Sequence, residues 1–318
     1  DDRTYIITQV QFIIMIHLWP MKYFVLPFSI LLLFSFNSCT SQTDRSPGFR
    51  YDLRRPSKEF DLPHALREIS GITFYSDHRL ACIQDEKGKI YIYNLKKEDV
   101  KESVEFGANH DYEAIAMVRD TFYVLHSTGT IFQVTGFGTP AQQTQKFDTF
   151  LKKENNTEGL CFDSITNSLL VACKGVSFKK EKEDLKEIYS FDLSTDQLSN
   201  KPVYRIHLGD LEKFMTDHQI SKPDDEEAHE LTSKKENSFF EPSEIAVHPI
   251  TQEIYVLSSV GKLIVVLDRT GAIREVATID PSIAAHPEGM TFSPDGKLFI
   301  SSEGKGDQKE ILEFTEIK

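Results

Sequence analysis

Five glutamates occupy the same place in five similar stretches of this sequence, and they are its strongest candidates for chemistry. Each one precedes a short run in which apolar residues alternate with polar or small ones. The five are Glu68, Glu113, Glu158, Glu244 and Glu288. If the stretches are equivalent parts of a repeated structure, their carboxylates converge. Carboxylates a few ångströms apart cannot all stay ionised unless protons, a cation or basic side chains compensate them.

The last of these stretches, 286–304, shows what the repeating unit is. Apolar residues alternate on both sides of the turn sequence SPDG at 293–296, which predicts a β-hairpin. The five glutamates are separated by 45, 45, 86 and 44 residues. A repeat of roughly 40–50 residues that carries several short strands is typical of a β-propeller, in which each repeat forms one four-stranded blade.

We therefore predict an all-β protein, a five-bladed β-propeller of four-stranded antiparallel blades with the glutamate-led strands innermost. Six blades are the alternative, because the separation of 86 residues is nearly two periods. No glutamate-led hairpin opens near residue 201, however, and a charged interruption at 179–186 and an insertion at 209–238 account for the extra length. The last repeat supplies only three strands, so residues 59–62 are expected to complete its blade and remove the open edges.

Residues 21–38 predict an export signal. They begin with Met21 and Lys22 and continue as an apolar run that stops at Cys39. The pattern resembles a bacterial lipoprotein signal, in which Cys39 becomes the acylated N-terminus. A transmembrane anchor and an ordinary cleaved signal are the alternatives. We therefore expect a lipid-anchored protein of the cell membrane or envelope.

The remaining segments complete the predicted domain organisation. Residues 1–20 are interpreted as an over-extension upstream of the signal, with a second membrane segment as the alternative. Residues 39–56 are expected to form a tether, and residues 57–318 a single propeller domain. The net charge of -13 excludes nucleic acid as a partner, because phosphate binding needs a basic surface. We expect a monomer that binds an unknown ligand or envelope protein.

The glutamates have two possible roles. A ring of oxygen ligands suits a hard cation, and Ca²⁺ accepts six to eight of them. No His or Cys recurs beside the glutamates, which disfavours zinc. The alternative is structural, because a carboxylate at the start of an inner strand can accept hydrogen bonds from the next blade. In each repeat one further polar residue follows the second strand and could line the same mouth of the channel or the opposite one. These residues are Asp85, Ser127, Lys174, Ser259 and Glu303.

The openings REISGITF, DYEAIAMV, NNTEGLCF, EPSEIAVHP and HPEGMTFSPDG resemble those of the SdiA-regulated family of bacterial propeller proteins, over about residues 60–318. The resemblance implies an exported or membrane-anchored five-bladed propeller with a calcium site, and no established activity. The sequence contains no nucleophile elbow, phosphate loop or Ser/His/Asp spacing. It therefore favours a non-catalytic, calcium-binding propeller lipoprotein of the envelope. The alternative is a metal-dependent hydrolase of the lactonase or esterase kind that uses the channel cation.

Overall fold

The computed structural model describes residues 43–176, 184–221, 239–303 and 310–317. The segment 1–20, the signal 21–38 and Cys39 lie outside these residues, as do most of the interruption at 179–186 and residues 222–238 of the insertion. Among the described residues, no helix is both long and apolar enough to cross a membrane.

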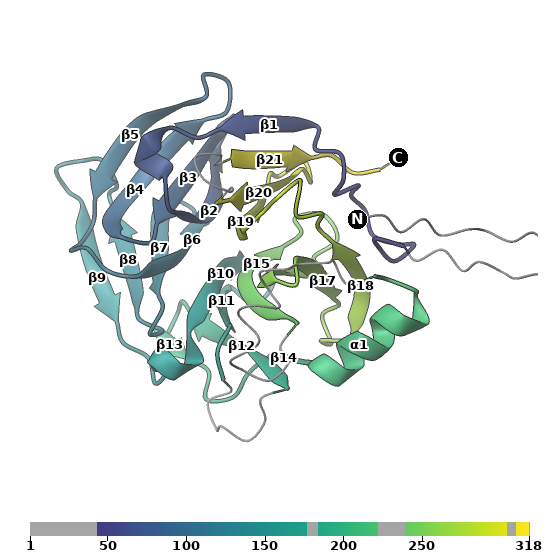
Figure 1. Ribbon diagram of the computed structural model, residues 1–318. Coiled ribbons are helices and arrows are strands. Elements are labelled where there is room, and N and C mark those ends of the chain that lie inside the picture. Colours follow the sequence, from purple (N-terminus) through teal and green to yellow (C-terminus); the bar gives the residue numbers. More distant parts are fainter. Residues whose placement is uncertain (1–42, 177–183, 222–238, 304–309, 318) are drawn as a thin grey trace, which may run out of the picture. The chain divides into compact units, whose positions relative to one another are not determined.

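Five antiparallel sheets make up the fold, and we call them blades 1 to 5 (Figure 1). Blade 1 contains β2 (Ile69–Ser76), β3 (Arg79–Gln84), β4 (Lys87–Asn94) and β5 (Asp99–Glu105). Blade 2 contains β6 (Tyr112–Val118), β7 (Thr121–His126), β8 (Ile131–Thr135) and β9 (Gln143–Phe147). Blade 4 contains β15 (Glu241–Val247), β16 (Ile254–Val260), β17 (Leu263–Leu267) and β18 (Ile273–Thr278).

Blades 3 and 5 depart from this simple order. Blade 3 contains β10 (Thr157–Asp163), β11 (Ser168–Cys173) and β12 (Leu185–Asp192), and β12 pairs with both β13 (Gln197–Leu198) and β14 (Tyr204–His207). Blade 5 contains β19 (Pro287–Phe292), β20 (Leu298–Ser302) and β21 (Glu310–Phe314), with β1 (Lys58–Asp61) on its outer edge. The helices are short: η1 (His64–Leu66), η2 (Lys153–Asn155) and α1 (Leu208–Asp217).

The innermost strands close a ring, which confirms the predicted five-bladed propeller. Strand β2 contacts β6, β6 contacts β10, β10 contacts β15, β15 contacts β19, and β19 returns to β2. The predicted closure is also confirmed, because β1 pairs with β21, with Phe60 opposite Ile311. The described part of the long third interval holds β13, β14 and α1 in place of a sixth blade.

Each apolar core cluster lies between two neighbouring blades. Leu80 of blade 1 and Phe299 of blade 5 are both buried in one cluster, and Leu125 of blade 2 shares another with Leu169 of blade 3. A single blade therefore has no core of its own. Burial requires the ring to be complete, which explains why one N-terminal strand is used to close it.

The N-terminal segment 43–57, most of which we expected to be a tether, packs against the propeller. Phe49, Tyr51 and Leu53 are buried in the cluster shared by blades 4 and 5. Backbone bridges join Arg45 to Ala277 and Tyr51 to Glu316. The folded domain therefore begins by residue 43, and this segment covers the edge of β18.

Candidate functional site

A β-bulge decides which side chain each innermost strand presents to the channel mouth. In blade 2, Tyr112 pairs with His126 and Ala114 with Leu125, so that Glu113 is the extra residue. The same irregularity in β10 and β19 leaves Glu158 and Glu288 without a partner across the hairpin. A bulge interrupts the alternation of a strand and redirects one side chain. Three of the predicted glutamates therefore occupy equivalent positions.

In blades 1 and 4 the bulge presents a serine. Strand β15 skips Ser243 between its paired residues Pro242 and Glu244, and Ser70 lies within the irregular start of β2. The equivalent set of side chains is Ser70, Glu113, Glu158, Ser243 and Glu288. The expected convergence of all five glutamates therefore fails for Glu68 and Glu244, which lie to either side of the bulge position.

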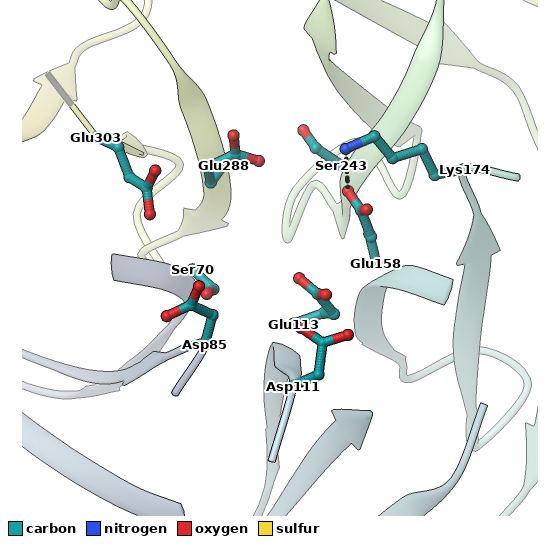
Figure 2. Close-up of a pocket in the computed structure, with 9 residues that line it drawn as sticks. All are labelled: Ser70, Asp85, Asp111, Glu113, Glu158, Lys174, Ser243, Glu288 and Glu303. Atoms are coloured by element: carbon teal, nitrogen blue, oxygen red, sulfur yellow. Dashed lines mark ion pairs between the residues drawn. The ribbon is translucent and has the colours of Figure 1, made fainter. Parts of the chain in front are cut away.

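These five bulge residues line one cavity of about 170 Å³ (Figure 2), which we call the acidic cavity. The described residues that line it are Ser70, Asp85, Asp111, Glu113, Glu158, Lys174, Ser243, Glu288 and Glu303. Asp85, Lys174 and Glu303 follow the second strands of their blades, so these three share a mouth with the glutamates. Six carboxylates thus face one ammonium group. Asp111 carried no repeat signal, because no acidic residue stands two positions before the other glutamates.

Lys174 neutralises one side of the acidic cavity. Its Nζ lies 2.9 Å from Oε2 of Glu158, and Nδ2 of Asn156 donates to Oε1 of the same carboxylate at 2.6 Å. Burial raises the pKa of Glu158, and Lys174 opposes that rise. Burial alone would lower the pKa of Lys174, but Glu158 and Glu288 outweigh it and raise the pKa of the ammonium. This lysine therefore stays charged at neutral pH.

The other carboxylates are compensated less well. Burial, followed by the charges of Glu158 and Asp111, raises the pKa of Glu113. Burial likewise raises the pKa of Glu288 to about 7, although Ser259 Oγ donates to its Oε1 at 3.0 Å. Asp85 has its pKa raised to about 6 by burial and by Glu68. At neutral pH, protons or an added cation are needed to relieve this repulsion.

Glu68 and Glu244 have other partners. Glu68 is partly exposed, and its Oε1 lies 3.3 Å from Nε of Arg67. Glu244 is 1% exposed, and its Oε1 accepts hydrogen bonds of 2.9 Å from the backbone N–H groups of Leu160 and Ile245. Because Leu160 belongs to β10, Glu244 joins blade 4 to blade 3. This is the structural role that the sequence analysis gave as the alternative.

The donor chemistry of the acidic cavity suits a hard cation, since its acidic and hydroxyl groups offer only oxygen. Within the described residues, however, no three Asp, Glu, His or Cys side chains form a group that could hold a metal ion. The arrangement with Glu158 paired to Lys174 is therefore not itself a coordination shell. A metal would need these carboxylates to move toward one another.

Further along the same innermost strands, the side chains that face the channel are mostly apolar. Beyond the acidic cavity these strands line a second cavity of about 290 Å³, where apolar side chains such as Met117, Phe162 and Phe292 predominate. Charged ligands are therefore favoured only near the beginnings of the inner strands.

Comparisons with known proteins agree with the fold. The model of the SdiA-regulated family matches residues 46–305. No curated protein matches the chain. A glutaminyl cyclase from Myxococcus xanthus is similar in structure, with a TM-score of 0.53, 14% identity, and coverage of 83% of this chain and 97% of that one. A Bacteroides thetaiotaomicron protein of unknown function has a TM-score of 0.48 and 12% identity, with coverage of 77% and 58%. At these identities the likeness concerns the fold alone.

Proposed function

The chain belongs to the SdiA-regulated family, and we propose that it is a non-catalytic, calcium-binding β-propeller lipoprotein of the bacterial cell envelope. One observation carries the cation-binding part of this proposal. Within the part of the chain that the structure describes, six carboxylates face a single ammonium group in a cavity of about 170 Å³. Lys174 forms its ion pair with Glu158 and only partly opposes the raised pKa of Glu113 and Glu288.

Calcium is the cation best suited to this cavity. It accepts six to eight oxygen ligands in irregular geometry, whereas Mg²⁺ requires a near-ideal octahedron and Zn²⁺ prefers nitrogen and sulfur. Glu113, Glu158 and Glu288 are the proposed protein ligands, because the bulges direct all three into the acidic cavity. The other carboxylates and the serine hydroxyls of the lining offer further oxygens.

The biological role we propose is display of a binding surface. A Ca²⁺ ion at the channel mouth presents positive charge on an otherwise acidic protein, and so favours a ligand or envelope protein that offers carboxylate or other oxygen groups. Acylation of Cys39 would hold the propeller at the membrane. The apolar run before Cys39 supports this part of the proposal.

The test is thermal unfolding of the full-length protein in chelator, Ca²⁺ and Mg²⁺. A ligand that binds only the folded state stabilises it by RT ln(1 + [L]/Kd), about 2.7 kcal/mol at 100 times Kd. We expect Ca²⁺ to raise the melting temperature by several degrees and Mg²⁺ by less. Glu113→Gln should reduce the Ca²⁺ effect. Glu98→Gln is the matched control, since it makes the same change at an exposed residue that pairs with Lys58 and does not line the cavity. An unchanged melting temperature between chelator and millimolar Ca²⁺ would overturn the proposal.

A metal-dependent hydrolase is the second candidate. Buried carboxylates with a raised pKa, such as Glu113 and Glu288, are the groups that serve as general bases in active sites. A panel of lactones and of carboxylate and phosphate esters, assayed with and without Ca²⁺, separates the two candidates. Turnover that requires Ca²⁺ and disappears in Glu113→Gln would replace the non-catalytic function with this one.

A further inference from the structure

Among the described residues, Lys174 is the one basic side chain that lines the acidic cavity. It lies directly after β11, on the side of the cavity formed by blade 3, and most of its side chain is buried. In Figure 2 its ammonium points toward Glu158. The other four blades have no lysine at the equivalent position. The residue there, after or at the end of the second strand, is acidic or carries a hydroxyl.

The backbone around Lys174 is held so that this contact is fixed. The N–H of Lys174 donates to the carbonyl of Asn156 at 2.8 Å. The carbonyl of Lys174 accepts a hydrogen bond of 2.8 Å from Nζ of Lys186. Asn156 in turn donates from its side chain to Glu158. Asn156 therefore positions both members of the ion pair. The contact is fixed by the local structure and does not depend on a freely moving lysine side chain.

The pairing engages both oxygens of Glu158. Its Oε1 accepts a hydrogen bond from Nδ2 of Asn156, and its Oε2 forms the ion pair with Nζ of Lys174. Both oxygens of the carboxylate therefore already have partners. While this arrangement persists, a metal ion has only the remaining lone pairs of Glu158 to bind, and no metal-holding group is in place among the described residues. An external cation must share Glu158 with Lys174 or displace it.

We propose that Lys174 is a built-in competitor for the external cation, and that it lowers the affinity of the acidic cavity by holding Glu158. This inference rests on the proposed function, because it concerns how the same cavity binds Ca²⁺. The competition makes the site respond to the Ca²⁺ concentrations found outside cells, since a tighter site would be filled at much lower concentrations. Lys174 is thus a residue that sets the affinity without being a ligand.

The experiment is calorimetric titration of the full-length protein with Ca²⁺. A neighbouring unit charge changes the binding of a proton by about one to three powers of ten. We therefore expect Lys174→Met to tighten Ca²⁺ binding at least about tenfold, and Lys174→Arg to leave it close to the wild-type value. Lys213→Met is the matched control, because Lys213 is exposed on α1 and pairs with Asp217. It should not change the affinity.

A double-mutant cycle distinguishes competition for Glu158 from a general effect of charge. If Lys174 acts by holding Glu158, adding Lys174→Met to a Glu158→Gln protein should produce only a small part of the gain. A full gain in that background would overturn the direct competition. Circular dichroism and melting curves confirm that each variant is folded, and Lys174→Gln provides a second, polar replacement if the methionine variant is not.

The outcomes separate this inference from the proposed function. If wild type binds Ca²⁺ and Lys174→Met or Lys174→Gln binds it equally well, the competition is refuted while the calcium site stands. If neither wild type nor any folded Lys174 variant binds Ca²⁺ at millimolar concentration, the proposed function itself is overturned, and this inference with it.

Discussion

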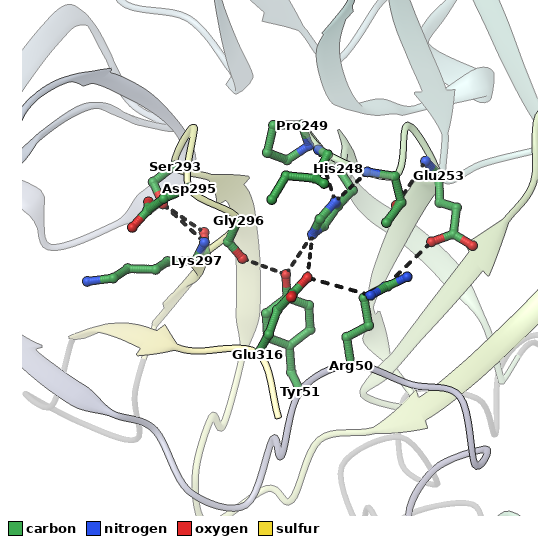
Figure 3. Close-up of polar contacts among 12 residues, drawn as sticks. Arg50, Tyr51, His248, Pro249, Glu253, Ser293, Asp295, Gly296, Lys297 and Glu316 are labelled. Atoms are coloured by element: carbon green, nitrogen blue, oxygen red, sulfur yellow. Dashed lines mark hydrogen bonds and ion pairs between the residues drawn. The ribbon is translucent and has the colours of Figure 1, made fainter. Parts of the chain in front are cut away.

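The hydroxyl of Tyr51 lies 3.0 Å from Nε2 of His248, and this contact fastens the N-terminal segment to blade 4 (Figure 3). The same hydroxyl donates to the carbonyl of Gly296 at 2.6 Å, in the hairpin turn of blade 5. Nδ1 of His248 faces the backbone N–H groups of Ile250 and Thr251. The network therefore assigns the proton of the neutral imidazole to Nε2, which donates toward Tyr51.

Tyr51→Phe tests how much this contact stabilises the fold. The substitution keeps the buried ring but removes the partner of the Gly296 carbonyl, while His248 keeps Glu316 at 3.2 Å. We therefore expect a loss of about 1–3 kcal/mol in the free energy of unfolding. Urea titration measures it. Tyr204→Phe is the control, because the hydroxyl of this half-buried tyrosine makes no hydrogen bond within the described residues. Equal losses in the two variants would contradict the role of the Tyr51 hydroxyl.

Acid should weaken the attachment of the N-terminal segment. Burial lowers the pKa of His248, and nearby Glu316 only partly opposes this. The unfolded chain therefore takes up a proton near pH 6.5 while the folded protein resists it, so His248 contributes stability that is lost as pH falls below about 6.5. We expect unfolding measurements at pH 7.5 and 5.5 to show a larger acid-induced loss in wild type than in His248→Gln. The reverse order would show that His248 does not carry this dependence.

Asp163→Asn should destabilise the junction of blades 3 and 4. Asp163 is fully buried, and its Oδ2 lies 2.6 Å from Nη2 of Arg269. Nη1 of Arg269 is itself buried without a partner among the described residues. Removing the carboxylate leaves a guanidinium uncompensated, which costs about 3 kcal/mol. Asp217→Asn breaks an exposed ion pair with Lys213 and should cost less than about 1 kcal/mol. Chemical denaturation of both variants checks the difference.

Glu244 should behave as a structural residue and not as a ligand. Burial raises its pKa well above the usual range, and its Oε1 already accepts two backbone hydrogen bonds. Glu244→Gln keeps the acceptor for Leu160 and Ile245 and should be tolerated. Glu244→Ala leaves two buried N–H groups unpaired and should cost about 3 kcal/mol. Melting curves with and without Ca²⁺ measure both effects, and a lost Ca²⁺ response in a stable Glu244→Gln protein would make it a ligand after all.

The anchor is tested at Cys39. We expect metabolic labelling with a fatty-acid analogue to mark the wild-type protein, and Cys39→Ala to abolish the label and release the protein from membranes. Stable attachment is expected because a lipoprotein cysteine carries more than one acyl chain, whereas one chain anchors only marginally. Membrane association that persists in Cys39→Ala would favour a transmembrane anchor.

Much of the architecture could be predicted from the sequence, because it depends on the length of the repeat and on the alternation of apolar and polar residues. Spacings near 45 residues predicted the blades, and the missing fourth strand of the last repeat predicted the role of residues 59–62. The segment 43–57 also carried a signal in the alternation of Phe49, Tyr51 and Leu53. Residues 39–56 were nevertheless predicted to be a tether. The partners of segment 43–57 are blades 4 and 5, roughly two hundred residues away.

The sequence by itself determined the propeller, its closure and the acidic character of the inner strand openings. Tertiary structure alone decided which side chains meet. A bulge shifts one residue in each inner strand, and a shift of one residue sends a side chain to a different face. Ser70 and Ser243 therefore enter the acidic cavity, while Glu68 remains outside it and Glu244 bonds to the neighbouring blade. The pairing of Lys174 with Glu158 likewise depends on how β11 ends, because Asn156 holds both residues there.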